Sequence, residues 1–253
     1  MILSLALAFC LLCMALLVYP GELTHVGTGA NRWLYNRGAA KYQEKWCSRA
    51  YTDKRYQRSI IGAVRAGLDG SGCHRILDLG CGTGHGLKLL AGSDIGDLAY
   101  TGVDYSHGML REFSSWLAGP GAEWADCSRL VNDELSVWSG CAEDSAYGAV
   151  MMLEVGEFLP DFVAVLGAAA GAIAPGGALV MTRPARLWWL CFPGRAQSRR
   201  SLSRAIRGAG LSSPVFIPWR GRYEIVIARR QSNPPSLSRR FTRNESVPTS
   251  AAR

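Results

Sequence analysis

Short apolar runs alternate along the chain, from Arg75 onward, with segments whose apolar residues recur at helical spacing. Helical segments are predicted to begin near Gly84, His107, Pro160 and Ser198. Strands that alternate with helices are typical of a parallel sheet covered by helices on both faces. The predicted strands are 75–79, 99–104, 123–125, 149–153, 178–182, 215–219 and 223–228.

The last two predicted strands differ from the others in their connection. Only the residues RGR separate Trp219 from Tyr223, which suits a hairpin and is too short for a parallel crossover. We therefore predict an α/β fold, with a Rossmann-like, doubly wound, mostly parallel sheet of seven strands and an antiparallel strand at one edge.

The N-terminal run MILSLALAFCLLCMALLVYP contains no charged residue. As a helix, the part before Pro20 would span about 27 Å, close to the ~30 Å hydrocarbon core of a bilayer. We expect a single transmembrane helix, with a cleaved signal peptide or a misassigned start codon as alternatives. Lysines and arginines follow the run and none precedes it, so we expect a single-pass, membrane-anchored protein whose body faces the cytoplasm.

Composition divides the chain into four predicted segments. Residues 1–20 form the membrane anchor, and 21–70 form a helical cap or lid. Residues 71–230 form the α/β domain. Residues 231–253 are polar and rich in Ser, Pro and Arg, so we expect a disordered basic tail.

Charge and cysteine content change this picture little. The 253 residues carry a formal net charge of +8 at pH 7, so polyanions and anionic membrane surfaces are candidate partners. The eight cysteines are scattered, and the one CxxC, from Cys10 to Cys13, lies inside the apolar run. Neither a disulfide framework nor a metal site is predicted.

A glycine-rich turn, DLGCGTG, follows the first predicted strand of the α/β domain. Glycines at such a turn let backbone N–H groups approach a ligand at the carboxyl ends of parallel strands. Gly80, Gly82 and Gly84 follow the spacing GxGxG, which departs from the GxGxxG of dinucleotide-binding folds. Asp104 ends the next strand 20 residues after Gly84, where an acid binds ribose hydroxyls. Both features fit a single cofactor.

These motifs resemble those of class I S-adenosylmethionine-dependent methyltransferases, most closely the small-molecule group that includes the methyltransferase type 11 and quinone-methylating families. The resemblance covers about 31–229. It implies S-adenosylmethionine as the cofactor, with the three glycines facing its methionine portion and Asp78 ordering the turn. GVDYSHGML is similar to the family's second motif, which implies that Asp104 bridges the ribose hydroxyls and that Tyr105 belongs to the same site.

Two further motifs extend the resemblance. AEWADCS is similar to the third motif, which implies that Asp126 accepts a hydrogen bond from the adenine amino group and that the amide of Cys127 reaches the ring. AVMMLEVGEFLPD resembles the fourth strand and the mouth of the active site. There Glu154 and Glu157 are candidates to orient the methionine amine or to take a proton from the acceptor.

The catalytic residue stays unassigned, because in-line methyl transfer needs a general base only when the acceptor arrives protonated. Glu154, Glu157 and Tyr42 are the candidates. Tyr42 and Trp46 belong to a helical, tyrosine-rich region, 30–61, that the glycine-containing stretch AGLDGSGC then ends. They could form a lid over the sulfonium, since a cation prefers an aromatic face, or pack in the core.

The acceptor is inferred from location. The segment from Phe162 to Tyr223 contains nine arginines and no acidic residue. Within it, Leu202, Ile206 and Ala209 recur at helical spacing. Such a basic amphipathic helix suits an anionic bilayer surface. Together with the anchor, it predicts a small-molecule or lipid acceptor that is hydrophobic or membrane-resident, such as a quinone, an isoprenoid or a phospholipid headgroup.

Three alternative functions stay open. One is an RNA methyltransferase that uses the arginines on phosphates, the second is a thiol or xenobiotic methyltransferase, and the third is a non-catalytic, membrane-anchored cofactor-binding protein. The chain lacks an NPPY-type motif after the fourth strand and begins with an apolar run. Nucleic acid is therefore the unfavoured partner.

Overall fold

The computed structural model describes residues 27–42, 44, 53–138, 146–185, 197–219 and 222–232. The expected membrane anchor lies outside the described residues, as does all but the first two residues of the expected tail. In the described parts of the chain, no helix is long and apolar enough to cross a membrane.

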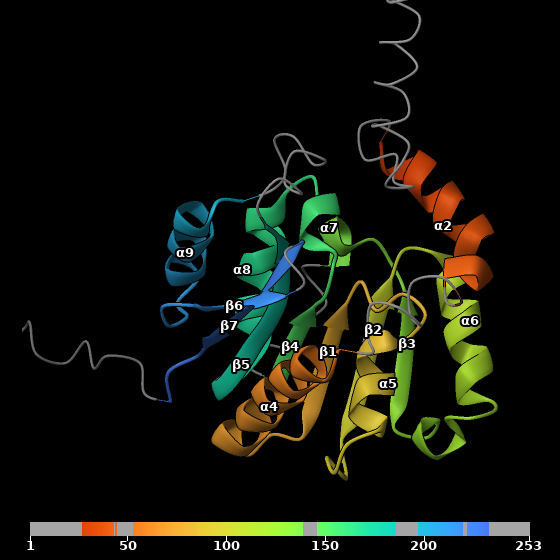
Figure 1. Ribbon diagram of the computed structural model, residues 1–253, viewed down its shortest axis with the longest axis horizontal. Coiled ribbons are helices and arrows are strands. Elements are labelled where there is room, and N and C mark those ends of the chain that lie inside the picture. The colour runs from red at the N-terminus through yellow and green to blue at the C-terminus, as the bar shows by residue number, and fades with distance from the viewer. Residues whose placement is uncertain are drawn as a thin grey trace, which may run out of the picture.

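Seven strands form a single central sheet (Figure 1). They are β1 (Arg75–Leu79), β2 (Ala99–Asp104), β3 (Ser128–Asn132), β4 (Tyr147–Met152), β5 (Ile173–Pro184), β6 (Val215–Trp219) and β7 (Tyr223–Arg229). Their order is β3-β2-β1-β4-β5-β7-β6. Strands β1 to β5 pair in parallel, whereas β7 runs antiparallel to both β5 and β6. The predicted α/β class, with a mostly parallel sheet and an antiparallel hairpin at one edge, is confirmed.

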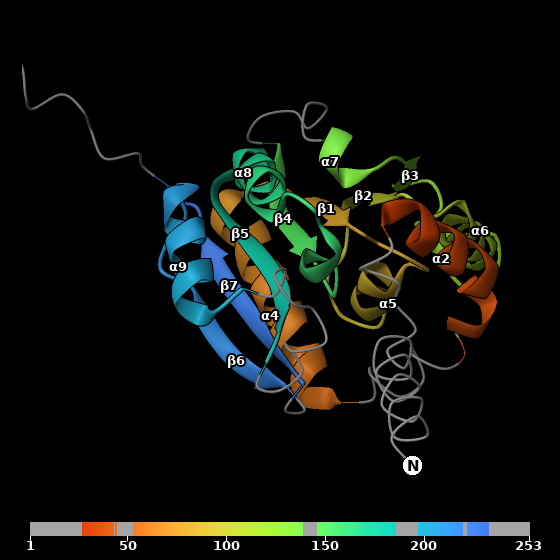
Figure 2. The same cartoon turned by 90° about the horizontal axis from the view of Figure 1, so that it is seen from above.

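Helices cover both faces of this sheet (Figure 2). The helical elements are α2 (Thr28–Tyr42), α4 (Lys54–Ser71), α5 (His85–Ala91), α6 (His107–Leu117), η2 (Ala122–Trp124), α7 (Leu135–Trp138), η3 (Gly156–Phe158), α8 (Phe162–Ala172) and α9 (Arg199–Gly208). Successive residues of β1, Ile76 and Leu77, belong to two different core clusters, because side chains alternate between the faces of a strand. One cluster contains α4, α5 and α6, and the other contains α8 and α9.

Helix α4 runs through the stretch that the sequence predicts as a break. Asp53 caps its first turn by accepting from the N–H groups of Arg55 and Tyr56, and Gly72 ends it in the left-handed conformation. Gly67 lies inside the helix because a Cβ there would approach the carbonyl oxygen of Gly148 to 2.6 Å. The glycine therefore allows close helix–sheet packing, and α4 belongs to the layer over the sheet and not to a separate cap.

The third predicted strand is wrong in position. Residues Ala122–Trp124 form the short helix η2, and β3 begins only at Ser128, which pairs with Tyr100 of β2. Strand β3 lies at the edge of the sheet and its residues are exposed or half-buried. Because an edge strand lacks the continuous apolar run of the central strands, the sequence pattern placed it several residues too early.

Helix α9 is amphipathic as predicted, but its apolar face packs against the core of the domain. Leu202 and Ile206 are buried in the core cluster shared with α8. Those two side chains are therefore unavailable for insertion into a bilayer, and attraction of the Arg-rich face to an anionic membrane stays a prediction. Arg200, Arg204 and Arg207 remain on its exposed side.

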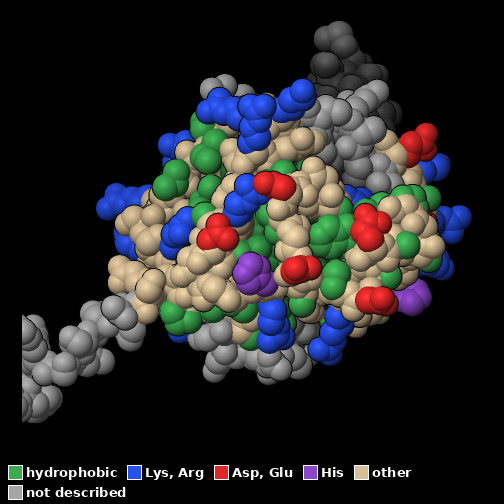
Figure 3. Space-filling view, turned by 90° about the horizontal axis from the view of Figure 1, so that it is seen from below, with side chains coloured by type: hydrophobic (Ala, Val, Ile, Leu, Met, Phe, Trp, Pro, Cys, Tyr) green, Lys and Arg blue, Asp and Glu red, His purple; other side chains and the backbone are tan. Residues whose placement is uncertain are grey.

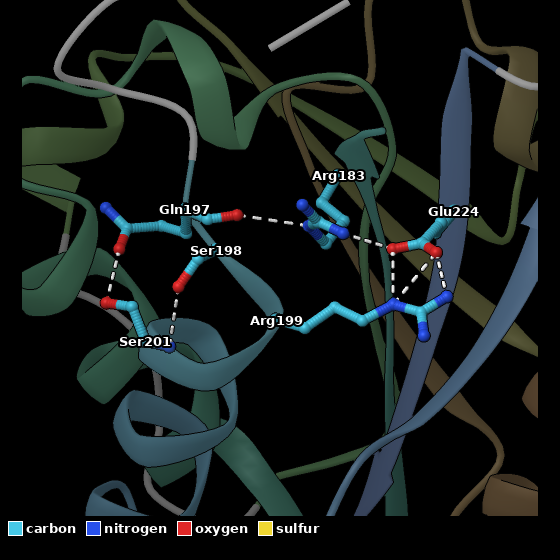
Figure 4. Close-up of polar contacts among 6 residues, drawn as sticks. All are labelled: Arg183, Gln197, Ser198, Arg199, Ser201 and Glu224. Atoms are coloured by element: carbon cyan, nitrogen blue, oxygen red, sulfur yellow. Dashed lines mark hydrogen bonds and ion pairs between the residues drawn. The ribbon is translucent and has the colours of Figure 1, made fainter. Parts of the chain in front are cut away.

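Two arginines of the basic stretch are paired with one acid of β7 (Figure 4). Glu224, whose side chain is 8% exposed, forms ion pairs with Arg183 and Arg199. Burial alone would raise the pKa of Glu224, but the hydrogen bonds to Arg199 and the charge of Arg183 lower it below its ordinary value. Arg183 also donates from Nε to the carbonyl of Gln197 at 3.1 Å. The cluster thus fixes the start of α9 to the β5–β7 end of the sheet.

Charges are mixed on the face formed by the amino ends of the parallel strands. Figure 3 shows Lys and Arg side chains gathered along the upper and left rim of this face, and acidic and histidine side chains nearer its centre and right.

Candidate functional site

The carboxyl ends of β1, β2 and β4 surround a cavity of about 860 Å³ that opens to solvent. Helix α2 lies over the same edge of the sheet (Figure 1). In open α/β sheets, ligands bind at the carboxyl ends of the strands, where the strand order reverses. Here the strand order runs outward from β1, to β2 and β3 on one side and to β4 and β5 on the other.

The glycines of the DLGCGTG turn have different surroundings, although all three have positive φ angles. Gly80 and Gly82 line the cavity. A Cβ on Gly80 would lie 2.5 Å from a methyl carbon of Val155, whereas a Cβ on Gly82 would meet nothing within 4 Å. Gly84 does not line the cavity, and a Cβ there would lie 2.3 Å from the ring of Phe113. Of the three glycines, only Gly80 and Gly82 therefore face the cavity, whereas the sequence predicts that all three face the cofactor.

Asp104 connects the end of β2 to the glycine turn. Its Oδ2 accepts from the N–H of Gly82 at 2.9 Å, and its Oδ1 accepts from the N–H of Ser106 at 2.7 Å. Each oxygen keeps a further lone pair for a donor in the cavity. Burial raises the pKa of Asp104 to about 6, against the lowering effect of both backbone hydrogen bonds.

Asp78 lies outside the lining of the cavity. Its carboxylate accepts a hydrogen bond from the hydroxyl of Tyr100 at 2.5 Å and is 2% exposed. Burial raises its pKa to about 7. A Cβ on Gly86, in the first turn of α5, would lie 2.4 Å from this carboxylate. The position of Asp78 fits the prediction that it orders the turn and does not touch the ligand.

Glu154 lines the cavity at the end of β4. It has a positive φ of 54°, and its N–H donates to the hydroxyl of Thr182 at 2.7 Å. Burial and the neighbouring charge of Glu157 raise the pKa of its carboxyl to about 8. The hydrogen bond to Thr182 helps to hold this strained backbone conformation, and the Glu154 side chain lines the cavity.

Glu157, a catalytic candidate from the sequence, does not line this cavity. It faces a second, smaller cavity of about 240 Å³ on the other side of η3. Its Oε1 accepts from the hydroxyl of Tyr223 at 2.8 Å, and its buried Oε2 has no hydrogen-bond partner. Burial raises the pKa of Glu157 to about 7. The structure thus corrects its assignment to the mouth of the ligand cavity.

Asp126 and Cys127 are also misplaced by the sequence reasoning. Both precede β3, and neither lines the cavity. A strand of five residues is about 16 Å long, so Asp126 and Cys127 lie at the amino end of β3, about one strand length from the carboxyl ends that surround the cavity. The residues that follow the carboxyl end of β3 take their place, and Glu134, Leu135 and Ser136 line the cavity.

Aromatic side chains surround the entrance of the cavity. The ring of Tyr35 meets Tyr42, Tyr105 and Phe158 edge to face, with centroids 6.0 to 6.4 Å apart. All four line the cavity. Tyr42 therefore lies where a lid residue was expected, and Trp46 lies outside the described residues. Tyr35 and Phe158 were missed, although Tyr35 and Tyr42 are two helical turns apart on α2.

Helix α2 is fixed in place over the cavity by polar contacts. The Asn36 Oδ1 accepts from the Ser106 hydroxyl at 2.9 Å and from the Gly108 N–H at 2.8 Å. Arg32 forms a 3.0 Å ion pair with Glu134 and stacks over Tyr105. These contacts join α2 to α6 and to the loop after β3.

The charge of the lining is acidic. Asp104, Glu134 and Glu154 line the cavity, whereas its described lining includes no Lys or Arg. Three carboxyls and four aromatic rings together favour a positively charged ligand. Among the described residues, no group of three or more His, Cys, Asp or Glu side chains could hold a metal ion.

Residues 77–179 match the family model described as a methyltransferase domain. Trans-aconitate 2-methyltransferase of Methylobacterium nodulans is 33% identical over 113 residues, which are 45% of this chain and 39% of that protein. This chain therefore spans well under half of the curated relative that it matches. The chain carries a class I S-adenosylmethionine-dependent methyltransferase domain.

Solved structures share the fold of this methyltransferase domain. An O-methyltransferase family protein from Burkholderia thailandensis aligns with a TM-score of 0.59 and 16% identity, over 83% of this chain and 62% of that one. The 4+2 cyclase SpnF aligns with a TM-score of 0.57 and 16% identity, over 73% and 85%. Because a cyclase is among these neighbours, the shared fold leaves the reaction to be argued from the site.

The cofactor of the methyltransferase domain is S-adenosylmethionine, and the described residues fit it. The space beside Gly82 is open, so a ligand can approach the backbone there. The buried Oδ1 of Asn31 lines the same cavity without a hydrogen-bond partner. The acidic and aromatic lining suits the positive charges of the sulfonium and the ammonium group.

Proposed function

We propose that this protein transfers a methyl group from S-adenosylmethionine to a small, uncharged and largely apolar acceptor. The observation that carries the proposal is the lining of the cavity, which combines acidic and aromatic side chains with apolar ones and has no Lys or Arg among its described residues.

The chain's own residues position and shield the reactants. S-adenosylmethionine supplies a methyl group on a positively charged sulfur, already activated for transfer. Gly80 and Gly82 leave room beside the backbone, Asp104 offers acceptor oxygens, and the Glu154 carboxyl, whose pKa is raised to about 8, offers a further polar group at the end of β4. Alignment of nucleophile and methyl group in a closed cavity can contribute about 7 to 11 kcal/mol. No proton acceptor is required unless the acceptor arrives protonated.

The lining argues for an uncharged acceptor. Trans-aconitate, the substrate in the name of the curated relative, is a tricarboxylic acid and anionic at neutral pH. An anion of that kind needs Arg or Lys partners, and near this cavity Arg32 is already paired with Glu134. Apolar side chains such as Leu135, Leu153 and Leu159 suit a hydrophobic molecule instead.

We also propose that the acceptor is membrane-resident and that the protein is anchored through 1–20 with the methyltransferase domain in the cytoplasm. The support is the uncharged N-terminal run and the basic residues that follow it. Exposed arginines of α9 add electrostatic attraction to anionic lipid, without insertion of the helix. A quinone or an isoprenoid fits this setting, whereas a phospholipid headgroup, the third candidate from the sequence, carries a charged phosphate and is the less suited acceptor.

The test uses the full chain in detergent. Isothermal titration with S-adenosylhomocysteine measures cofactor binding. Incubation with methyl-labelled S-adenosylmethionine and detergent-solubilised membrane extract, followed by organic extraction, measures transfer. We expect binding, and label in the organic fraction. The variant Gly82→Ala places a methyl group in the cavity beside the backbone and should weaken both signals at least tenfold.

Trans-aconitate, small thiols and bulk RNA are the competing acceptors. Label on trans-aconitate or on RNA, with none in the organic fraction, would overturn the proposed acceptor class. Binding without transfer to any fraction would favour the non-catalytic alternative. No cofactor binding at all would refute the proposed activity itself.

A further inference from the structure

Asn31 carries an unexplained buried polar atom. The residue is 4% exposed, and its Oδ1 has no hydrogen-bond partner among the described residues. An unpaired buried acceptor destabilises a fold by the lost hydration of that group. Asn31 also lines the ligand cavity. An acceptor that is unsatisfied in the protein alone, at the wall of a cavity, points to a donor supplied by a ligand.

The position of Asn31 is fixed by the helix that carries it. Five residues further along α2, Asn36 binds the start of α6, and Gly108 lacks a Cβ that would otherwise lie 2.4 Å from the carbonyl oxygen of Asn36. Next to Asn31, Arg32 is paired with Glu134. The helix therefore cannot turn to bring the amide to solvent without breaking contacts on both sides.

The chain offers no charged donor of its own to this atom. The described lining of the cavity lacks Lys and Arg, and its titratable residues nearest the glycine turn are acids. An N–H or O–H donor must then come from the molecule that fills the cavity. S-adenosylmethionine has three groups of that kind: the ammonium, the adenine amino group and the ribose hydroxyls.

We propose that Asn31 is a further cofactor-binding residue, which accepts a hydrogen bond from an N–H or O–H group of S-adenosylmethionine through Oδ1. The inference rests on the proposed function, because it takes the cavity to be the cofactor site. It makes α2 part of the cofactor site and not merely a cover, since the helix contributes a hydrogen bond that exists only with the ligand in place.

The variants are chosen to separate binding from folding. Asn31→Leu has a similar size and removes the unpaired acceptor, so the ligand-free protein should be at least as stable as the wild type. Affinity for S-adenosylhomocysteine should fall about tenfold or more, because one hydrogen bond to the ligand is lost. Asn31→Asp keeps an acceptor oxygen and should retain most of the affinity. Lys41→Leu, at an exposed position of the same helix outside the cavity lining, is the matched control.

Isothermal titration and the unfolding midpoint of the ligand-free protein are measured for each variant. Unchanged affinity of Asn31→Leu, with lowered stability of the ligand-free protein, would overturn the inference and leave the proposed function intact. Failure of the wild type to bind S-adenosylhomocysteine would instead refute the proposed function.

A second ligand identifies the donor. Methylthioadenosine lacks the amino-acid portion of the cofactor but keeps the nucleoside. If Asn31→Leu weakens S-adenosylhomocysteine only, the donor is the ammonium group. If it weakens both ligands equally, the donor lies in the nucleoside. Both results support the role of Asn31, whereas weakening of neither ligand contradicts it.

Discussion

Two glycines of the same motif should respond to alanine in opposite ways. Gly82 and Gly84 both have positive φ angles, of 53° and 83°, where an L-residue costs about 1–2 kcal/mol. A Cβ on Gly82 enters the open space of the cavity, whereas a Cβ on Gly84 collides with Phe113 at 2.3 Å. Only the second substitution disturbs the core.

The magnitudes follow from these surroundings. Gly82→Ala should lower the free energy of unfolding by about 1–2 kcal/mol, which is the backbone cost alone. Gly84→Ala adds overpacking against a buried ring, worth about 1–3 kcal/mol more, and should cost about 2–5 kcal/mol in total. The order reverses for cofactor binding. Gly82→Ala should weaken S-adenosylhomocysteine at least tenfold, whereas the folded fraction of Gly84→Ala should bind it normally.

Urea unfolding and isothermal titration measure the two quantities separately. Gly62→Ala, at an exposed position inside α4 with nothing near the added Cβ, is the control and should raise stability by about 0.5–1 kcal/mol. Equal loss of stability in Gly82→Ala and Gly84→Ala would refute the assigned surroundings. Normal cofactor binding by Gly82→Ala would show that the ligand does not approach this glycine.

Two other substitutions test the buried acids. The pKa of Glu157 is raised to about 7 from 4.5, so its contribution to stability is present below pH 4.5 and lost as the pH rises through 7. The free energy of unfolding of Glu157→Gln, minus that of the wild type, should therefore rise by about 3 kcal/mol between pH 4.5 and pH 8. Urea unfolding at each pH measures this difference, and a difference that does not change with pH would contradict the reasoning. Glu224→Gln leaves Arg183, 11% exposed, without its charge partner and should cost about 3–5 kcal/mol; Arg200→Gln, on the exposed side of α9, should stay within about 0.5 kcal/mol.

Much of the fold could be predicted from the chain because the central strands are continuous apolar runs between turns. Strands β1, β2 and β6 have the predicted bounds, and the short RGR connection identified the antiparallel hairpin. The predicted elements were wrong at positions where contacts with distant parts of the chain, and not the local sequence, determine the structure. The exposed edge strand β3 lacks a clear apolar period, and Gly67 in α4 serves packing and not a break.

The candidate site could be predicted only in the part built by local sequence. Gly80, Gly82 and Asp104 lie together because a strand, its turn and the neighbouring strand place them. Because the third strand was predicted too early, Asp126 was expected at its carboxyl end, beside the cofactor. In the structure Asp126 precedes β3, whereas Glu134 follows β3 and lines the cavity. The residues of α2 that line the cavity do so because of where the helix packs on the domain. The spacing of apolar residues along the chain does not predict that position.

The family model covers one half of the cavity and leaves the other outside, and this limits what relatives can say about the acceptor. The glycine turn, Asp104 and Glu154 lie within 77–179, the segment that matches the family model. Helix α2, with Asn31 and its two tyrosines, lies outside that segment. Side chains of the unmatched helix therefore line the cavity without a counterpart in the family model. A relative that matches only 45% of this chain does not identify the acceptor, which has to be found by experiment on this protein.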